Sequence, residues 1–484
     1  MIRYSVISLF LLLGASAACA QSLALEECRI SAGPGFPGIK ARCGTMPRPL
    51  DPENPDNGTI ELRVAVVPAL NLTPEPDPLV PLAGGPGQGA VQFYAAHFDA
   101  FEGVRRSRDI LLVDQRGTGE SSRMDCPADD ELIDEEFSVE LTVEATLACL
   151  EQLPHDPRFF TTSVAVKDLE AVRVALGYPS LNLYGVSYGT RVAQHFARRY
   201  PESTRTIVLD GVVPPQIALG PEIATEGQTA VDRLLQRCAD DVDCAARFPN
   251  IAQTFAAVVA ALKESPATIQ VPDPSTSRPE ELSFGVGEFA IAVRLLAYSA
   301  NSIALLPLLI SEAGDGNYVP MAAQFQMTVI TLSDMLSLGM HNAVMCAEDA
   351  PFFDKATIDY DGLAASYMGT TQLDALEAIC SVWPRGPLDA EFKVPLATDL
   401  PVLLLSGDAD PITPPRYAEM AAVDFTNALH LIGEHQGHGQ LAVGCMPRIV
   451  TQFIETASPE DLETECLRRS FIMPFFLDFS GPKP

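Results

Sequence analysis

The sequence predicts an α/β fold in which a mostly parallel central sheet is flanked by helices and carries an inserted, mainly helical cap. Short apolar runs bounded by Gly, Pro or Asp alternate with helical stretches, as expected for a sheet that is buried on both faces. This alternation stops at about residue 213, where helical patterns replace it, and it resumes at residue 401. The 484 residues are more than one compact core usually holds, which leaves room for an insertion.

Seven segments are predicted to be strands of the sheet. The first, residues 58–68, alternates polar and apolar side chains in the manner of a half-buried strand. The other six are short apolar runs, at residues 78–83, 109–114, 181–186, 206–210, 401–406 and 428–433. Helices are expected over residues 169–176 and about 190–199, and each ends close to a Gly or Pro.

The interval between the fifth and sixth strands is predicted to be the cap. It contains helical patterns at residues 230–247, 251–264 and 289–309 and a Pro/Ser-rich linker at 272–279. We interpret the interval as one insertion into the sheet. The predicted organisation is a signal peptide (1–20), the first part of the α/β core (21–212), the helical cap (213–395) and the second part of the core (396–484).

The N-terminus has the pattern of a secretory signal peptide. Arg3 is followed by the apolar run 6–13 and by the small-x-small pattern of residues 18–20. The sequence therefore predicts a secreted or periplasmic protein that is cleaved near Ala20. Lipidation of Cys19 is an alternative, but Ser16 stands where a lipoprotein signal would carry an aliphatic residue.

No stable membrane span is predicted for the mature chain. The second long apolar stretch, residues 289–310, is interrupted by Arg294, Asn301 and Pro307, so we interpret it as a helix of the cap or core. The chain is strongly acidic, with 63 Asp and Glu against 32 Lys and Arg and a formal net charge of −31. Such a charge repels nucleic acid and anionic membrane surfaces, so neither is an expected partner.

Ten cysteines remain once Cys19 is set aside with the signal peptide, an even number in a chain predicted to reach an oxidising compartment. Sequence alone does not fix their connectivity. They do fall into local pairs, and we expect the disulfides Cys28/Cys43, Cys126/Cys149, Cys238/Cys244, Cys346/Cys380 and Cys445/Cys466. No C-x-x-C pair or Cys/His cluster has zinc-site spacing, so no metal site is predicted.

The strongest chemical signal is a G-x-S-x-G motif at residues 185–189, with Ser187 at its centre. A predicted strand precedes it and a predicted helix follows it, which is the context that presents a serine hydroxyl in a tight strand-to-helix turn. The first backbone N–H of that helix, at Tyr188, and the helix dipole favour a developing oxyanion. The alternative is a serine in an ordinary turn.

A glycine-rich turn, residues 84–87, directly follows the predicted strand at 78–83. Glycines allow a backbone N–H to point into a site, as the second donor of an oxyanion hole requires. Taken alone, this stretch is equally consistent with a simple turn.

A serine nucleophile needs a base, and the base needs an orienting acid that precedes it in the chain. His435 and His438 lie in the loop after the last predicted strand, and we prefer His438 because Gly437 and Gly439 flank it. Asp408 and Asp410 end the strand before, and we prefer Asp410, with Asp408 as a turn residue.

Together these residues resemble the proline iminopeptidase and tripeptidyl aminopeptidase family of serine peptidases, which has the α/β-hydrolase fold. The resemblance covers most of the mature chain. It rests on GGPG, DQRGTGES, GVSYGT, LDGVVPP, GDADPITP and GHG, which start at residues 84, 114, 185, 209, 407 and 437. Residue by residue, the family's pattern implies a triad of Ser187, Asp410 and His438.

The same resemblance implies oxyanion donors at Gly85 and Tyr188, and a loop with Asp114 and Arg116 that supports the oxyanion turn. Ala83 departs from the pattern, because proline iminopeptidases usually carry a histidine before GGPG. The signal peptide and paired cysteines are closer to the secreted tripeptidyl aminopeptidases. Family members hold the substrate's N-terminal ammonium with acidic cap residues, and the candidates are Glu222, Glu226, Glu348 and Asp349.

The resemblance implies an exported serine aminopeptidase that needs no cofactor and acts on short peptides with a free N-terminus. An esterase or lipase with the same triad is the alternative within catalysis, since a triad does not distinguish amides from esters. A catalytically inactive binding protein is the alternative outside it. The sequence does not predict the residue released, the number released or the oligomeric state.

Overall fold

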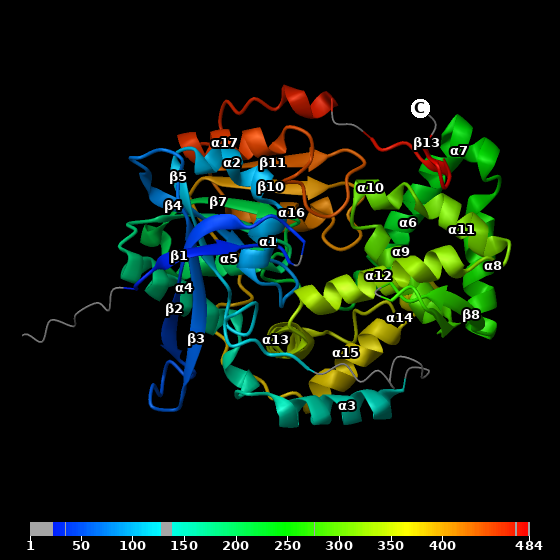
Figure 1. The fold of residues 1–484 in the computed structure, drawn as a ribbon, viewed down its shortest axis with the longest axis horizontal. Coiled ribbons are helices and arrows are strands. Elements are labelled where there is room, and N and C mark those ends of the chain that lie inside the picture. Colours follow the sequence, from blue (N-terminus) through cyan, green and yellow to red (C-terminus); the bar gives the residue numbers. More distant parts are fainter. Residues whose placement is uncertain (1–22, 34, 127–137, 275, 470–471, 483–484) are drawn as a thin grey trace, which may run out of the picture.

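The computed structural model describes residues 23–33, 35–126, 138–274, 276–469 and 472–482. The predicted signal peptide, with Cys19, lies outside the described residues. Figure 1 shows the α/β core on the left and the helical cap on the right, with the early and late parts of the chain meeting in the core.

Within the described residues, nine strands form one sheet in the order β1-β2-β3-β5-β4-β6-β7-β10-β11. Strands β5, β4, β6, β7, β10 and β11 are parallel to one another. Strands β1, β2 and β3 extend the sheet as an antiparallel edge. Their bounds are β1 Glu26–Ile30, β2 Ile39–Pro49, β3 Thr59–Val67, β4 Glu75–Leu82, β5 Arg108–Val113, β6 Leu181–Val186, β7 Thr204–Asp210, β10 Val402–Gly407 and β11 Ala428–Gly433. The prediction of a mostly parallel sheet is confirmed.

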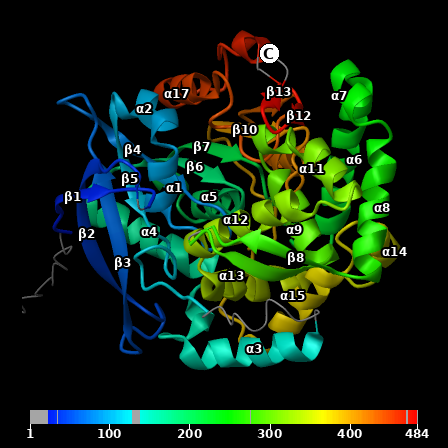
Figure 2. The same ribbon diagram turned by 45° about the vertical axis from the view of Figure 1, so that its right-hand side comes forward.

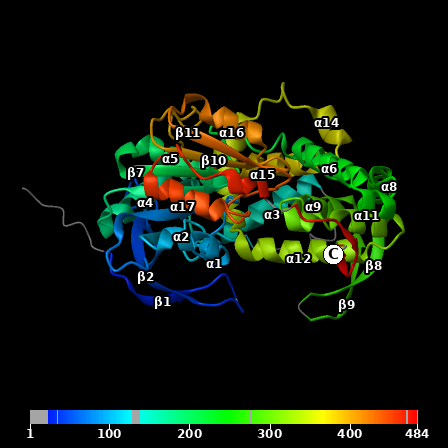
Figure 3. The same ribbon diagram turned by 90° about the horizontal axis from the view of Figure 1, so that it is seen from above.

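Helices cover both faces of the sheet, which is why most side chains of the parallel strands are apolar. One face packs against α1 Ala90–Ala96, α2 Glu102–Arg105 and α17 Met446–Thr456. The opposite face packs against α4 Thr162–Leu176, α5 Tyr188–Arg199 and α16 Pro415–Ala421. Figure 3 shows these two layers with the sheet between them.

The segment between β7 and β10 has its own apolar core. Its helices are α6 Ile223–Asp240, α7 Val242–Arg247, α8 Ile251–Glu264, α9 Val286–Leu296, α10 Ala300–Ile303, α11 Leu306–Gly314, α12 Val319–Met335, α13 Leu338–Val344, α14 Tyr360–Ala365 and α15 Thr371–Val382. Helix α15 of this segment packs against α3 Val139–Gln152, which belongs to the first part of the chain (Figure 2). A π-helical turn, Met345–Asp349, directly follows α13.

Two long helices expected in this segment are broken. The helix expected over 230–247 divides at Asp241, whose side chain accepts the Cys244 N–H at 2.8 Å and so starts α7. The helix expected over 289–309 divides into α9, α10 and α11, because Ser299 caps α10 and Pro307 lies in the first turn of α11.

The predicted linker 272–279 is instead the turn of a hairpin. Strands β8 Ala267–Pro272 and β9 Pro279–Phe284 pair antiparallel on either side of it, and the hairpin projects from the edge of the cap (Figure 3). A second small ribbon, β12 Phe476–Asp478 with β13 Gly481–Pro482, lies near the C-terminus.

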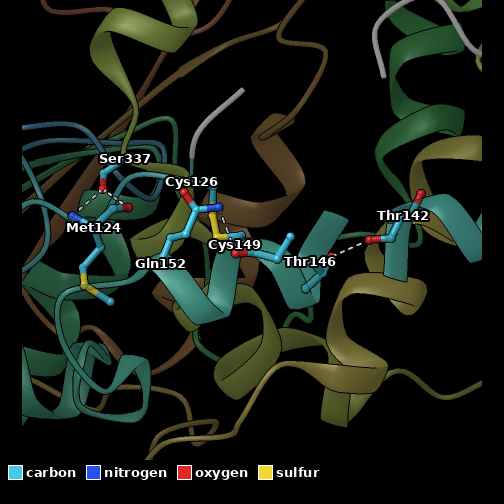
Figure 4. The surroundings of a disulfide bond; sticks show 8 residues. Met124, Cys126, Thr142, Thr146, Cys149, Gln152 and Ser337 are labelled. Carbon is cyan, nitrogen blue, oxygen red and sulfur yellow. Dashed lines mark hydrogen bonds between the residues drawn. A yellow bond between two sulfur atoms is a disulfide. The ribbon is translucent and has the colours of Figure 1, made fainter. Parts of the chain in front are cut away.

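The ten cysteines beyond Cys19 form disulfides between the same local partners that the spacing suggests: Cys28–Cys43, Cys126–Cys149, Cys238–Cys244, Cys346–Cys380 and Cys445–Cys466. Cys126–Cys149 ties α3 to the loop that holds Met124 (Figure 4). The Met124 N–H donates to Ser337 Oγ, and the Ser337 hydroxyl donates to the Met124 carbonyl. The disulfide therefore anchors α3 next to the segment that enters α13.

Removing this disulfide should destabilise the protein. The bond joins residues 23 positions apart, and closing a loop of that length stabilises a fold by about 3 kcal/mol in the chain-entropy model. We expect the Cys126→Ala/Cys149→Ala variant to unfold at a correspondingly lower denaturant concentration than the wild type. Non-reducing peptide mapping of the wild type is the control, and a link from Cys126 to any other cysteine would contradict the prediction.

In the ranges that the structure describes, no helix combines the length and the apolar character needed to cross a bilayer.

Candidate active site

Ser187 lies in a sharp turn between β6 and α5. Its φ of 56° and ψ of −126° are a conformation that non-glycine residues rarely adopt, and the Ser187 N–H donates to the Asp210 carbonyl at 2.9 Å. A Cβ on Gly185 would collide with the Gly189 carbonyl, and a Cβ on Gly189 would collide with the Leu82 carbonyl. Both glycines of the motif are therefore required for this turn.

The glycine-rich turn after β4 lies against the same serine. An ideal Cβ on Gly84 would lie 3.0 Å from the Ser187 Cβ, and Gly85 has a φ of 109°, in the region that favours glycine. Tyr188 is the first residue of α5, so its N–H is among the amides that have no partner within the helix. The glycine-rich turn and the first residue of α5 therefore both adjoin Ser187 at the carboxyl edge of the sheet.

The cap holds the glycine-rich turn in place. The Ser337 N–H donates to the Gly87 carbonyl at 3.0 Å, and Nδ1 of His341 lies 3.1 Å from the Pro86 carbonyl, which fixes Nδ1 as the protonated nitrogen. Burial lowers the pKa of His341, so its imidazole is neutral at physiological pH.

Asp114 and Arg116 lie behind the same turn. The Asp114 carboxylate accepts from the N–H groups of Val91, in α1, and Glu120, at 2.9 and 3.0 Å. Arg116 is fully buried and pairs with Asp168 at 2.7 Å. Both residues hold loops that surround the turn, and neither supplies a group to Ser187.

Asp410 and His438 are hydrogen-bonded to each other. Asp410 Oδ2 lies 2.7 Å from Nδ1 of His438 and accepts from the Thr413 hydroxyl at 2.7 Å. Its other oxygen accepts the N–H groups of Ile412 and Thr413 at 2.8 and 2.9 Å. The carboxylate is buried, fully hydrogen-bonded and fixed in orientation.

Tyr298 of the cap holds His438 in two ways. The backbone N–H of His438 donates to the Tyr298 carbonyl at 2.7 Å, and the Tyr298 ring packs edge-on against the imidazole with centroids 5.2 Å apart. Gly211, directly after β7, makes room for the ring, because a Cβ there would lie 2.9 Å from His438 Cε1. Its φ of 65° also favours glycine.

Electrostatics couple the two groups. Burial disfavours the imidazolium form of His438, but the negative charge of Asp410 and its hydrogen bond outweigh burial and raise the pKa of His438. Burial alone would raise the pKa of Asp410, but the charge and hydrogen bond of His438 outweigh it and lower that pKa. Asp410 is therefore ionised and stabilises the imidazolium that forms when His438 accepts a proton.

The residues considered as alternatives contact each other instead. The His435 N–H donates to Asp408 Oδ1 at 2.6 Å, and His435 has a φ of 57°. Asp408 thus stabilises the turn of the loop that carries His438. Within the described part of the chain, neither the Asp408 nor the His435 side chain hydrogen-bonds to Ser187 or His438.

Asp210 is a site residue that the motif search did not single out. Its carbonyl accepts the Ser187 N–H, and its buried carboxylate accepts the Tyr184 hydroxyl at 2.7 Å. The same carboxylate accepts the Gln440 N–H at 2.7 and 2.9 Å and the Leu441 N–H at 2.9 Å. Asp210 therefore connects the turn of Ser187 with the loop of His438. A charged residue at the end of a buried strand is the sequence signal that could have identified it.

Replacing Asp210 with Asn should disturb both loops. Every partner of the carboxylate is a donor, so the Asn NH₂ would face a backbone N–H in either orientation, at a cost of about 1–3 kcal/mol. We expect kcat/KM to fall roughly tenfold together with stability. Asp109→Asn is the matched control, because Asp109 also accepts one N–H and one tyrosine hydroxyl, but at the start of β5. Equal kinetic losses in the two variants would contradict a positioning role for Asp210.

Two of the candidate ammonium-binding acids lie at the start of α6: Glu222 directly precedes the helix and Glu226 lies in its first turn. Glu222 Oε2 accepts from Arg416 and from the Tyr417 hydroxyl, each at 2.6 Å, and Glu226 lies 2.8 Å from Arg416. The Glu222 side chain is 50% exposed and that of Glu226 18% exposed. The structure brings these two acids together, next to α16.

The other two, Glu348 and Asp349, are fully buried in the π-helical turn. Asp349 binds Arg191 through both oxygens, at 2.8 and 2.9 Å, and Lys393 at 3.2 Å. Glu348 accepts the N–H and the hydroxyl of Thr162 at 2.6 and 2.9 Å. Burial raises the pKa of Glu348 to about 7. This pair contacts α5 through Arg191, whereas Glu222 and Glu226 bind Arg416 of α16.

Comparison with protein families gives two matches along the chain. Residues 77–266 match the model described as alpha/beta hydrolase fold, and residues 365–466 match the model described as TAP-like protein. The first match contains Ser187 and the glycine-rich turn, and the second contains Asp410 and His438.

Curated proteins similar to this chain include peptidases. The serine protease Hip1 of Mycobacterium tuberculosis is 27% identical over 429 residues, which cover 80% of this chain and 79% of that protein. The tripeptidyl aminopeptidase of Streptomyces coelicolor is 28% identical over 39% of each chain. The proline iminopeptidase of Xylella fastidiosa is 31% identical over 29% of this chain and 33% of that one.

Solved structures with a similar fold include the proline iminopeptidase of Mycobacterium smegmatis. It is 14% identical, covers 85% of this chain and 98% of its own, and has a TM-score of 0.38.

Proposed function

Since this chain is an α/β hydrolase related to serine peptidases, we propose that it is an exported aminopeptidase that works through an acyl-enzyme. It releases residues, singly (often proline) or as a tripeptide, from peptides with a free N-terminus. Ser187 is the nucleophile, His438 the general base and Asp410 the residue that orients His438. The hydrogen bond between the buried, ionised Asp410 and Nδ1 of His438 is the observation that carries this proposal.

The proposed reaction has two halves. Ser187 Oγ attacks the scissile carbonyl while Nε2 of His438 takes its proton, and the N–H groups of Gly85 and Tyr188 bind the oxyanion. His438 then protonates the leaving amine, and the N-terminal part of the peptide stays on Ser187 as an ester. Water, deprotonated by His438, hydrolyses that ester and regenerates the serine.

Export is supported by the cysteines and by the N-terminal pattern. Disulfides persist in oxidising compartments and are rare in the cytosol. Five of them occur among the described residues, in a chain whose first 20 residues have the charge and apolar pattern of a signal peptide.

The substrate's ammonium would be held by an acidic residue at the mouth of the site. Of the four candidates, Glu222 and Glu226 retain exposed surface, and Arg416 is the charge that an ammonium would replace. We therefore propose this pair before the fully buried Glu348 and Asp349, whose partners are within the protein.

The test is a substrate panel of proline, alanine and Ala-Ala-Pro chromogenic amides, each with a free and with an acetylated N-terminus, beside a p-nitrophenyl ester. Hydrolysis of the free amides but not of their acetylated forms is the expected result. The preferred length then distinguishes release of one residue from release of three. Turnover of the ester alone would overturn the aminopeptidase proposal and leave an esterase with the same triad.

A further inference from the structure

Arg294 places a positive charge beside the proposed base. It lies in the last turn of α9, and its Nη2 lies 3.4 Å from the hydroxyl of Tyr298, one turn further along the chain. The Tyr298 carbonyl in turn accepts the backbone N–H of His438, and the Tyr298 ring packs against the His438 ring. The positive charge of Arg294 also acts on His438 and on His341.

This guanidinium has no carboxylate partner. Across the ranges that the structure describes, no Asp or Glu oxygen lies within 4.0 Å of Arg294, whereas the buried arginines, Arg108, Arg116 and Arg191, each bind an aspartate. The Nε atom of Arg294 is buried and has no hydrogen-bond partner among the same residues. A half-buried cation with an unused donor is costly to maintain unless a ligand supplies the missing acceptor. A guanidinium without a carboxylate partner offers an anion a charge and directed hydrogen bonds.

The position relative to His438 determines which part of the substrate would meet this guanidinium. In the proposed reaction His438 protonates the leaving amine, so groups packed beside His438 face the leaving part of the peptide. The acyl part stays on the opposite side, bound to Ser187 and the oxyanion donors.

We propose that Arg294 binds a carboxylate on the leaving part of the substrate. This inference rests on the proposed function and adds a specificity to it. In a short peptide the carboxylate is the C-terminal one, and in a longer peptide it is an acidic side chain just after the scissile bond. In both cases the group that Arg294 binds is a carboxylate one or two residues beyond the bond that is cut.

The experiment compares three leaving groups behind one acyl part. Ala-Ala-Pro-Ala with a free C-terminus, the same peptide as C-terminal amide, and Ala-Ala-Pro-Asp amide differ only in whether and where a carboxylate is present. If release of a single residue is preferred, Pro-Ala, Pro-Ala amide and Pro-Asp amide replace them. We expect the wild type to cleave the free acid roughly tenfold or more faster in kcat/KM than the neutral amide. The Asp peptide shows whether a side-chain carboxylate is accepted as well.

Three variants assign this preference. Arg294→Met keeps the length of the side chain and removes the charge, and it should bring the ratio of free acid to amide close to one. Arg294→Lys keeps the charge and should retain part of the ratio. Arg247→Met removes an exposed arginine from α7 of the same cap and should leave the ratio as in the wild type.

A wild-type ratio near one, or an undiminished ratio in Arg294→Met, would overturn the inference. The ratio is internal to each variant, so a general loss of activity or folding does not imitate the result. Acyl esters of 4-hydroxybenzoate and 4-hydroxybenzamide distinguish a failure of this inference from a failure of the aminopeptidase proposal. They contain no scissile peptide bond, and their leaving groups differ in whether they carry a carboxylate. A preference for the benzoate that Arg294→Met abolishes would support the carboxylate site even if no peptide were cut.

Discussion

Replacing Ser187 with Ala should lower kcat by at least about a thousandfold for every substrate that the enzyme turns over. In the proposed reaction this side chain supplies the atom that attacks the carbonyl, and alanine has no such atom. What remains is the contribution of the oxyanion donors and of substrate binding, which in serine peptidases leaves only a small residual rate. The measurement is kcat with the best amide and the best ester of the substrate panel.

The matched control is Ser203→Ala, in the short turn between α5 and β7. Ser203 donates to Glu170 at 3.3 Å and lies at the opposite edge of the sheet. This variant should keep kcat within about twofold of the wild type, since it changes only a weak, partly exposed hydrogen bond. Near-normal activity in Ser187→Ala, with circular dichroism showing a folded protein, would refute the assignment of the nucleophile.

Replacing Asp410 with Asn should lower kcat by roughly a thousandfold to ten-thousandfold. The neutral amide of the introduced asparagine cannot stabilise the imidazolium form of His438. Its NH₂ group can also donate to Nδ1, which favours the tautomer of His438 that carries its proton on Nε2 and cannot act as the base. Asp408→Asn is a close control, because Asp408 is only two residues away and accepts a single N–H, from His435. A larger loss in Asp408→Asn than in Asp410→Asn would reverse the choice between the two aspartates.

The pH profile provides a second readout of the same variant. Neutral His438 is the active form, so kcat/KM falls as the pH drops through its pKa. The charge of Asp410 raises that pKa, so the wild type should lose activity at a higher pH than an ordinary histidine, near 6.5, would dictate. In Asp410→Asn the remaining activity should persist to lower pH, and an unshifted acid limb would contradict the coupling.

The parallel part of the sheet could be predicted because each strand is a short apolar run between turn residues. The antiparallel edge could not. Strand β2 contains Pro47 and Pro49, and a proline normally argues against a strand. In the structure β1 pairs with β2 only as far as Cys43, and residues 44–49 of β2 pair with β3 alone. Among the described strands, that part of β2 therefore has one edge without a neighbour, where a proline, which has no N–H, breaks no hydrogen bond. Sequence alone does not show which side of a strand is unpaired.

In the candidate site, the sequence indicated the motif residues to which the family's pattern assigns a role. It could not indicate residues that act through distant partners. Asp210 contacts Gln440 across 230 positions, and only the fold brings β7 next to the loop of His438. Arg294 appeared as an interruption of an apolar stretch, and its position beside Tyr298 and His438 depends on how the cap packs on the core. The acids Glu348 and Asp349 are adjacent in sequence to no cation, yet in the structure Arg191 and Lys393 neutralise Asp349.

The most direct test of the central claim is to trap the acyl-enzyme. The enzyme is mixed with the p-nitrophenyl ester of Ala-Ala-Pro or of proline, each with a free N-terminus, quenched in acid during turnover and mapped by peptide mass spectrometry. We predict that the peptide carrying Ser187 gains the mass of the tripeptidyl or prolyl group, and that Ser187→Ala gains none. Turnover without an acyl group on Ser187, or with one on another residue, would contradict the account.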